Sequence, residues 1–518
     1  MSFLRRPFSR RTPEANHEDN SGHESDVTDG SLHYVVEKAG NDSGLSYQEA
    51  TGAPVETSSP LGYSVGPITI IFLNISKMIG TGVYSTPSSI LKGTGSVGLS
   101  MIYWALGFLT SIASFSVYLE FASYFPNRSG SEVVYLEQAW PRPKWLFPTA
   151  FAFQSVALSF SSGNAIVPEP RANFQNPFEG TATAYGLTNA LYRIIFSYAG
   201  YENAFNVVNE VKDPVRQIRK NGWIALAIVT VLYILANIAY FAADINRYIL
   251  VPKADLAAAK EIAASLFFEN VFGSSRAVRG LNFLITLSSF GNLLTVLIGS
   301  SRMLRECGRQ GVLPYPRFWA STRPFGTTLG PYLVKWILTV VMVVAPPAGD
   351  AFNFIADLQV YPSAFFGFVM TVGLYVVRWR RKRLSLPRPI FKAWDVIIVF
   401  NIVKDVYLLV MPWYPPAGGV FAGDVSFWYA TYVVAGIGIL LGCGVYYWLW
   451  IYAVPKLKGY EIRQQVLELA DGAQSHKLIK VPIAELAEWD ATHDHVGRPL
   501  QQTPSEQATE EEKKGLDA

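Results

Sequence analysis

Apolar segments about as long as a membrane is thick recur along this chain and limit the folds open to it. A helix rises about 1.5 Å per residue, so roughly 20 apolar residues are needed to cross the ~30 Å hydrocarbon layer of a bilayer. The sequence therefore predicts an all-α polytopic membrane protein. About ten segments of this kind are present, at residues 65–91, 98–125, 146–167, 184–210, 222–243, 281–301, 331–347, 351–377, 394–412 and 427–453.

The composition agrees with a membrane protein. Charged residues make up 16% of the 518 residues and hydrophobic residues 50%, whereas a soluble domain is roughly 25% charged. The N-terminus has arginines but no apolar core followed by small residues, so we expect no cleavable signal peptide. Cys307 lies at the edge of a basic loop and Cys443 within the last apolar segment, and we expect no extracellular disulfide from either.

Polar tails flank the apolar segments. Residues 1–60 are rich in Ser, Gly, Asp, Glu and Asn and poor in aromatic residues, a composition that buries too little apolar surface to offset the entropy of ordering. We therefore predict a disordered cytoplasmic N-terminal tail over 1–60, a transmembrane domain over 61–455 and a cytoplasmic C-terminal tail over 456–518.

Lysines and arginines in short loops predict the orientation, because cytoplasmic loops carry an excess of them. With the N-terminus inside, the basic loops at 142–144, 212–220, 302–309 and 378–383 all face the cytoplasm. The loop at 413–426, on the other side, has no basic residue. Both termini are therefore predicted to be cytoplasmic.

The first apolar segment is interrupted near its middle by Gly80-Thr81-Gly82, within LNISKMIGTGVYSTPSSIL. A helix entering at Val65 covers about 21 Å before it reaches Ile79, close to mid-bilayer. Unpaired backbone groups are costly in lipid, so a helix break at this depth is tolerated only where it is buried in protein or lines a cavity. Glycines also serve as packing points between membrane helices, and one segment alone does not decide between the two.

The fourth apolar segment, LYRIIFSYAGYENAFNVVNEV, has a similar interruption at Ala199 and Gly200, with polar Ser197, Glu202 and Asn203 beside it. Two interrupted segments at corresponding positions of two halves indicate a secondary transporter with an inverted repeat and a site near the midplane. The helix N-terminus after the first break suits a carboxylate. Carbonyls freed at the breaks suit an ammonium group, so the pair favours a zwitterionic amino acid over simple packing.

Three stretches carry a resemblance to a known family: SKMIGTGVYSTPSSIL, FSYAGYENAFNVVNEVKDP and VYLEFASYFPNRSGSEVVYLEQAW. Together they resemble amino acid permeases of the amino acid, polyamine and organocation superfamily, in its L-type branch, and most of all the fungal high-affinity methionine permeases. The similarity runs over about residues 61–455. It implies a leucine-transporter-like bundle of twelve spans, with a five-plus-five inverted repeat and two discontinuous helices.

The resemblance also implies roles for residues at the two breaks. Amides of the first break would bind the substrate carboxylate, at Gly80, Thr81 and Gly82. Carbonyls of both breaks would bind the substrate amine, and the aromatic ring of Phe196 would lie over the substrate as an inner part of a gate. The carbonyls concerned are those of Met78, Ile79, Phe196, Ser197 and Ala199.

The chain departs from the family pattern after its third apolar segment. FSSGNAIV runs directly into PEPRANFQNPFEG, which resembles the loop that enters the sixth span. The end of span three and all of spans four and five are therefore predicted to be missing at Val167 and Pro168. This loss leaves the orientation of later spans unchanged but removes one wall of the site. We expect impaired transport, from a skipped exon in the gene model or from a true splice variant.

Three ionisable residues are candidates for coupling or gating, because charged groups within membrane segments usually have a function. Lys77, about 18 Å along the first segment, can take the place of a coupling cation or pair with carbonyls freed by the break. Glu202 can bias the substrate charge, accept a proton or cap the half-helix that it begins. Glu120 lies near the cytoplasmic interface, where solvation is favoured over an inner-gate ion pair.

Other charged residues are weaker candidates. Lys404 and Asp405 are adjacent and are expected to point to different helix faces, and Arg193 has no predicted partner. All six histidines lie in the tails, so we expect no catalytic residue, metal or cofactor in the membrane domain and no enzyme. His493 and His495 flank Asp494, and we interpret all three as solvated.

The leading hypothesis is proton-coupled secondary transport of methionine or another neutral amino acid across the plasma membrane by alternating access. The alternative is a non-transporting amino acid sensor, or an inactive truncated form. We expect no nucleic acid partner, and no disulfide-linked heavy subunit because no cysteine faces outward. Fungal permeases are typically removed from the surface after ubiquitination, so Lys38, the one lysine of residues 1–60, is either a site for a ubiquitin ligase adaptor or an ordinary solvated residue.

Overall fold

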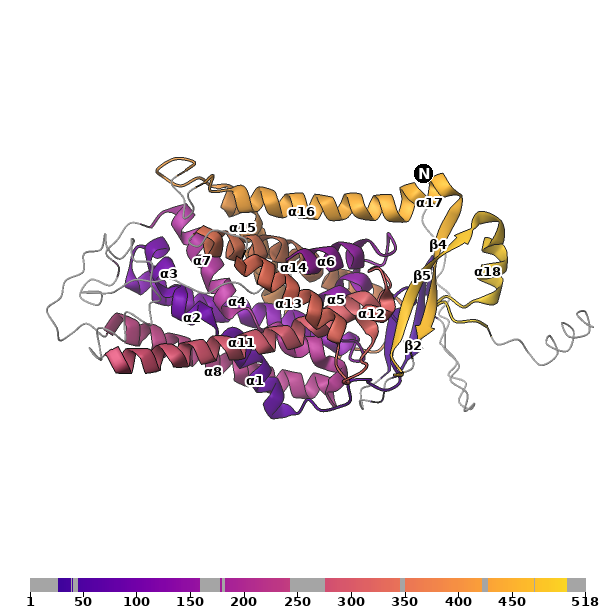
Figure 1. The fold of residues 1–518 in the computed structure, drawn as a ribbon, viewed down its shortest axis with the longest axis horizontal. Helices are drawn as coiled ribbons and strands as arrows, with labels where there is room; N and C mark the ends of the chain where they lie inside the picture. The colour runs from indigo at the N-terminus through magenta and orange to yellow at the C-terminus, as the bar shows by residue number, and fades with distance from the viewer. Residues whose placement is uncertain are drawn as a thin grey trace, which may run out of the picture.

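The computed structural model is a bundle of helices with strands gathered at one end (Figure 1). It describes residues 27–38, 40, 45–158, 178, 182–242, 275–344, 350–421, 427–469 and 471–500. The predicted junction at Val167 and Pro168 lies outside the described residues.

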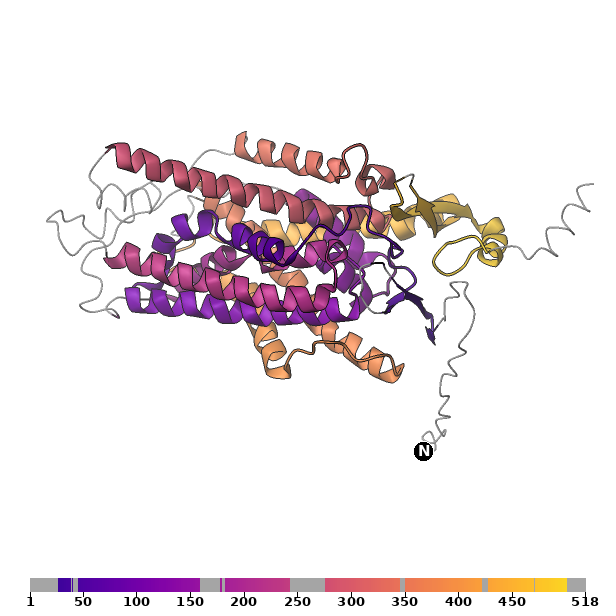
Figure 2. The ribbon, with the colours of Figure 1, turned by 90° about the horizontal axis from the view of Figure 1, so that it is seen from below.

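Six helices in the described part of the chain are long and apolar enough to cross a membrane. They run roughly parallel along the long axis of the bundle (Figures 1 and 2). A mostly helical chain with several apolar spans is therefore confirmed, while the count of about ten spans and the inverted repeat remain predictions. The six are α4 (Val97–Tyr124), α8 (Pro214–Ala242), α11 (Ser275–Arg309), α14 (Asp350–Arg383), α15 (Asp395–Val410), which η2 (Met411–Trp413) extends to the required length, and α16 (Thr431–Trp448). Shorter apolar helices are α1 (Pro67–Met78), α6 (Leu146–Ala157) and α13 (Leu329–Val344).

The first apolar segment is divided where the glycines predicted a break. Helix α1 ends at Met78, and α2 (Thr81–Ser85) and α3 (Pro87–Thr94) follow it. Ile79 and Gly80 have backbone angles outside the helical region, so they join α1 to α2 without continuing the helix. The carbonyls at the end of α1 therefore have no helical partner further along the chain.

The fourth apolar segment is divided in the same way. Helix α7 (Ala184–Tyr198) ends before an extended Ala199, and the 3-10 helix η1 (Tyr201–Glu210) begins after Gly200. Gly200 has a φ of 145°, a conformation that glycine adopts readily and other residues adopt only under strain. Both predicted interruptions are thus present in the structure.

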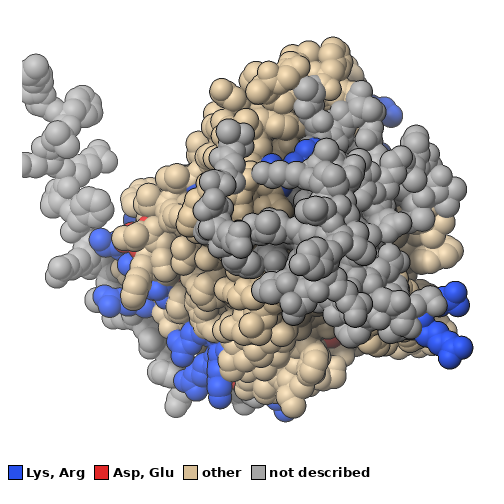
Figure 3. All heavy atoms as spheres, turned by 90° about the vertical axis from the view of Figure 1, so that its left-hand side faces the viewer, with Lys and Arg blue, Asp and Glu red and all other residues tan. Residues whose placement is uncertain are grey.

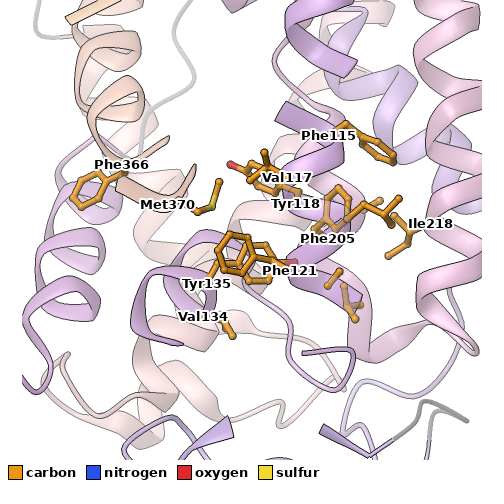
Figure 4. Close-up of a cluster of buried hydrophobic side chains, with 14 of the residues drawn as sticks. Phe115, Val117, Tyr118, Phe121, Val134, Tyr135, Phe205, Ile218, Phe366 and Met370 are labelled. Atoms are coloured by element: carbon orange, nitrogen blue, oxygen red, sulfur yellow. The ribbon is translucent and has the colours of Figure 1, made fainter. Parts of the chain in front are cut away.

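An aromatic core holds η1 against α4 (Figure 4). The rings of Phe115 in α4 and Phe205 in η1 have centroids 5.2 Å apart, and Phe121 stacks on Tyr135 of α5 (Glu132–Ala139) at 4.9 Å. A Cβ added at Gly222 of α8 would lie 2.3 Å from the Phe115 ring, so α8 packs directly on the same core. This packing fixes one half of the second broken segment.

Both tails contain ordered strands, which corrects the predictions of an all-α chain and of disorder throughout residues 1–60. Strand β2, LHYVVE, buries Val35, which packs with Ala50 and with Val496 of the other tail. The first 26 residues lie outside the described residues. The strands are β1 (Val27–Asp29), β2 (Leu32–Glu37) and β3 (Ser46–Glu49) in one antiparallel sheet, and β4 (Tyr460–Glu468) and β5 (Gln474–Pro482) in a hairpin, followed by η4 (Ile483–Glu485) and α18 (Leu486–Thr492).

Buried ion pairs and a hydrogen bond attach the two tails to the end of α11. Arg305 binds Glu56 of the N-terminal tail with an Nη2–Oε1 distance of 2.5 Å, and Arg309 binds the same carboxylate at 3.5 Å. The Arg309 guanidinium also donates to the Gln474 carbonyl at 2.7 Å. Figure 3 shows the end of the bundle opposite the strands. The part of its surface that is visible there is mostly free of charge, with Lys and Arg near the rim. At the strand end, Arg381 and Arg383 of α14 donate hydrogen bonds to the Tyr47 carbonyl and to the Asp29 carboxylate.

Acidification should loosen this attachment through His476 of β5. Burial, together with the nearby Arg128 and Arg309 guanidinium groups, lowers the pKa of His476 from 6.5 to about 3. A group whose pKa is lower in the folded state contributes stability above its unfolded pKa and loses it as the pH falls from about 6.5 toward 3. We expect the thermal stability of the purified protein to fall between pH 7 and pH 5, and less so in a His476→Gln variant. The partly exposed His493 provides the matched control, His493→Gln, and an equal acid-induced loss in all three proteins would contradict the prediction.

Candidate functional site

The two helix breaks lie against each other. A Cβ added at Gly82 would lie 2.9 Å from the Cα of Ser197, and one added at Gly200 would lie 2.9 Å from the backbone nitrogen of Met78. Real side chains do not approach backbone atoms this closely, so glycine is what permits the contact at both positions. The Thr86 and Ser197 hydroxyl oxygens are 2.9 Å apart in the same region. The structure therefore brings the two predicted binding segments together.

An ion pair joins the breaks. The Lys77 ammonium lies 2.7 Å from Oε1 of Glu202, and both side chains are mostly buried. The other Glu202 oxygen accepts a hydrogen bond from the Gly200 amide at 2.8 Å. Glu202 thus caps η1 and neutralises Lys77 at once, and Lys77 pairs with a carboxylate rather than with the carbonyls that the sequence suggested as the alternative.

Tyr233 of α8 contacts both breaks, although it was not predicted from the sequence. Its hydroxyl lies 2.5 Å from the Met78 carbonyl oxygen and 2.6 Å from that of Ser197. A hydroxyl has one proton, so it donates to one of these carbonyls at a time. Two of the carbonyls predicted to bind an amine therefore already have a partner within the protein.

Asn292 of α11 is a second missed residue. Its side-chain amide donates to the carbonyl of Ser76 at 2.9 Å and to that of Lys77 at 2.6 Å. A Cβ added at Gly80 would lie 2.6 Å from this amide group. The end of α1 is thus held from the side by α11, which satisfies carbonyls that the break leaves without helical partners.

A cavity of about 660 Å³ opens beside the breaks. This volume falls in the range of pockets that bind small molecules. Its walls come from both broken segments and from α4, α5, α6, α11, α13, α14 and α15. The arrangement can enclose a small molecule between the breaks and the helices around them.

The predicted site residues divide into those that line this cavity and those that support it. Ser197 is buried behind the wall, while Ile79 packs against the hydrophobic core. Thr81 is the first residue of α2. The lining residues include Lys77, Met78, Gly80, Gly82, Phe196, Ala199 and Glu202.

Glu120 lies away from the cavity and is fully buried, so the prediction of a solvated side chain is wrong. Its carboxylate forms a two-bond ion pair with Arg378 of α14, at 2.7 and 2.6 Å. It also accepts a hydrogen bond from the Ala393 amide at 2.7 Å. Glu120 therefore ties α4 to the basic end of α14.

Lys404 and Asp405 of α15 both line the cavity, which corrects the expectation that they point to different faces. Their charged groups are 3.0 Å apart, because the long lysine side chain can bend back toward its neighbour. Arg193 of α7 forms a buried ion pair with Asp357 of α14, also at 3.0 Å. Among the described residues, no cluster of histidine, cysteine and carboxylate side chains could hold a metal ion.

Comparison with known proteins assigns this chain to a family. The family model for amino acid permeases matches residues 65–170 and 166–440. The chain belongs to the amino acid permease family. The high-affinity methionine permease of Saccharomyces cerevisiae is 30% identical to it over 508 aligned positions, which cover 83% of this chain and 87% of the yeast protein.

Two further relatives agree with this assignment. The low-affinity methionine permease of the same yeast is 21% identical, with 88% of this permease and 96% of the yeast protein covered. The human large neutral amino acids transporter small subunit 2 is 24% identical, with 83% and 87% covered. These relatives are transporters rather than enzymes. This permease is therefore a multi-pass membrane protein that functions in amino acid transport.

Proposed function

We propose that this permease carries methionine or another neutral amino acid across the plasma membrane by alternating access, coupled to protons. The observation that supports this most directly is the contact between two helix breaks beside a cavity of about 660 Å³. Two of the similar proteins are named methionine permeases, and they supply the substrate class.

The substrate carboxylate is proposed to meet the amides of Gly80, Thr81 and Gly82, where α2 begins. Amides at the start of a helix have no helical partner, which suits an anionic group. The substrate amine is proposed to meet the carbonyls of Ile79, Phe196 and Ala199. The carbonyls of Met78 and Ser197 contribute less, because the Tyr233 hydroxyl already lies within hydrogen-bond distance of both.

A neutral substrate side chain is supported by the charges around the breaks. Lys77 and Glu202 neutralise each other, and so do Lys404 and Asp405. A charged substrate side chain placed between these pairs would have to break one of them. Coupling to protons is proposed for the Lys77–Glu202 pair, since a change of charge on either side chain would release the contact that joins the two breaks.

The cytoplasmic placement of both termini is supported by the basic residues of α14 that contact the strands of the tails, Arg381 and Arg383. Lys38 is exposed at the end of β2, where a ubiquitin ligase adaptor can reach it.

Cys307 and Cys443 are buried and unpaired, which supports function without a disulfide-linked heavy subunit.

A missing pair of spans is supported by how the relatives align. The family match consists of two parts that meet at residues 166–170. The alignment with the yeast high-affinity permease has 508 positions, but 83% of this 518-residue chain is about 430 residues, so roughly 80 positions have no counterpart here. That length suits two membrane helices of roughly 20 residues each with their loops. The same loss favours the second candidate function, a sensor that binds an amino acid without transporting it.

Uptake measurements test this function. In yeast cells without their own methionine permeases, we expect the chain as it stands to bind labelled methionine and accumulate little of it. Insertion of the corresponding yeast segment between Val167 and Pro168 should raise accumulation several-fold at equal surface expression, because it rebuilds a wall of the site. Binding without accumulation in both proteins would favour the sensor, and absence of both binding and uptake in the two proteins would contradict an amino acid as the substrate.

A further inference from the structure

Lys335 of α13 is a buried lysine that faces the cavity. The residue is 5% exposed and belongs to the cavity wall, with α13 packed against α11. Among the described residues, no hydrogen-bond or ion-pair partner is found for its ammonium group. A lysine in this position contrasts with the rest of α13, which is strongly apolar.

The other ionisable side chains on the cavity wall have partners. Lys77 is paired with Glu202 at 2.7 Å, and Lys404 with Asp405 at 3.0 Å. The Glu132 carboxylate accepts hydrogen bonds from the Tyr118 hydroxyl, at 2.6 Å, and from Ser131. In the described part of the protein no carboxylate is paired with Lys335, so a positive charge on its amine has no compensating group there.

An uncompensated charge inside a membrane protein is costly, and such groups pair with an opposite charge or lie on an ion or substrate path. The cavity is the side on which Lys335 is open, so the compensating group has room to bind there. An ammonium group binds carboxylates and halide ions through charge and hydrogen bonds.

We propose that Lys335 binds a monovalent anionic group inside the cavity. The anion is either the carboxylate of the bound amino acid or a small inorganic anion such as chloride. The first source rests on the proposed function and would draw the carboxylate of the substrate away from the amides of the first break toward α13. The second source would place chloride beside a neutral amino acid, with Lys335 as its ligand.

Binding to the purified full chain tests the proposal. The proteins are the parent, Lys335→Met, the charge-keeping Lys335→Arg, and Lys382→Met, which removes an exposed lysine at the end of α14 as a matched control. If the anion is chloride, replacing chloride by gluconate should weaken methionine binding at least tenfold in the parent and in Lys382→Met, and should have no effect in Lys335→Met. Lys335→Arg should keep the dependence on chloride.

If the anion is the substrate carboxylate, methionine binding should not depend on chloride. Lys335→Met should then weaken methionine binding at least tenfold and leave the binding of methioninol, which has no carboxylate, unchanged. An equal loss for both ligands would indicate a structural role and overturn this source. Equal methionine binding by the parent and by Lys335→Met in both salts would overturn the whole proposal.

A chloride-induced rise in melting temperature separates this inference from the proposed function. If the parent binds no amino acid, the proposed function fails. A chloride-induced rise that is present in the parent and lost in Lys335→Met would still support the anion site. Equal chloride effects in both proteins, or none in either, would then overturn it.

Discussion

Replacing Gly200 by alanine should weaken methionine binding by about thirtyfold or more. The φ of 145° at Gly200 is unfavourable for alanine, and the added Cβ would lie 2.8 Å from the Met78 side chain and 2.9 Å from the Met78 backbone nitrogen. Backbone strain of this kind costs on the order of 1–3 kcal/mol, and overpacking costs a similar amount. The breaks can relieve both only by moving apart, which disrupts the proposed site at its centre.

Labelled-methionine binding to the purified protein measures this effect. Gly438 of α16 provides the matched control, because a Cβ added there meets nothing within 4 Å. Gly438→Ala should bind methionine as the parent does, since alanine is favoured over glycine within a helix. Size-exclusion profiles and melting temperatures establish that both variants fold. Binding by Gly200→Ala within about threefold of the parent would show that the contact between the breaks is not needed for the site.

The helix breaks could be predicted from the sequence because their cause is local. Glycines within an apolar segment at mid-depth can only be tolerated where protein covers them, and the structure has a break at Gly80 and another at Gly200. The Lys77–Glu202 contact could be predicted from the sequence less directly. Each residue was a candidate beside its own break, but their pairing depends on how α1 and η1 pack together.

Residues that reach the breaks from other helices could not be predicted. Tyr233 and Asn292 lie in ordinary apolar helices, and nothing nearby in the sequence distinguishes them from packing residues. Lys335 is an ionisable residue inside an apolar segment, which is a weak indication of a functional role. The strands of the N-terminal tail were missed for another reason. The average composition of residues 1–60 hides the short run of strand-favouring residues Tyr34, Val35 and Val36, and the burial of Val35 depends on the distant Val496.

Replacing Lys77 by methionine should have the second large effect, because it leaves the Glu202 carboxylate without its partner. Removing one member of a buried ion pair costs about 3–5 kcal/mol, which corresponds to a hundredfold or greater loss if it falls on the binding-competent state. Glu202→Gln, which leaves Lys77 unpaired, should show a similar loss. The matched comparison is the double variant Lys77→Met with Glu202→Gln, which removes both charges and should regain much of the methionine binding.

The double variant also separates a structural role from a role in coupling. In the chain with the missing segment restored, substrate-driven proton uptake reports coupling, and labelled methionine reports binding. If the pair couples transport to protons, the double variant should bind methionine while proton uptake is lost, because neither remaining side chain changes its charge. Retained proton uptake would remove Lys77 and Glu202 from coupling and leave them as the contact that holds the two breaks together. A double variant as weak as either single variant would show that the charges bind substrate themselves, since removing both then restores nothing.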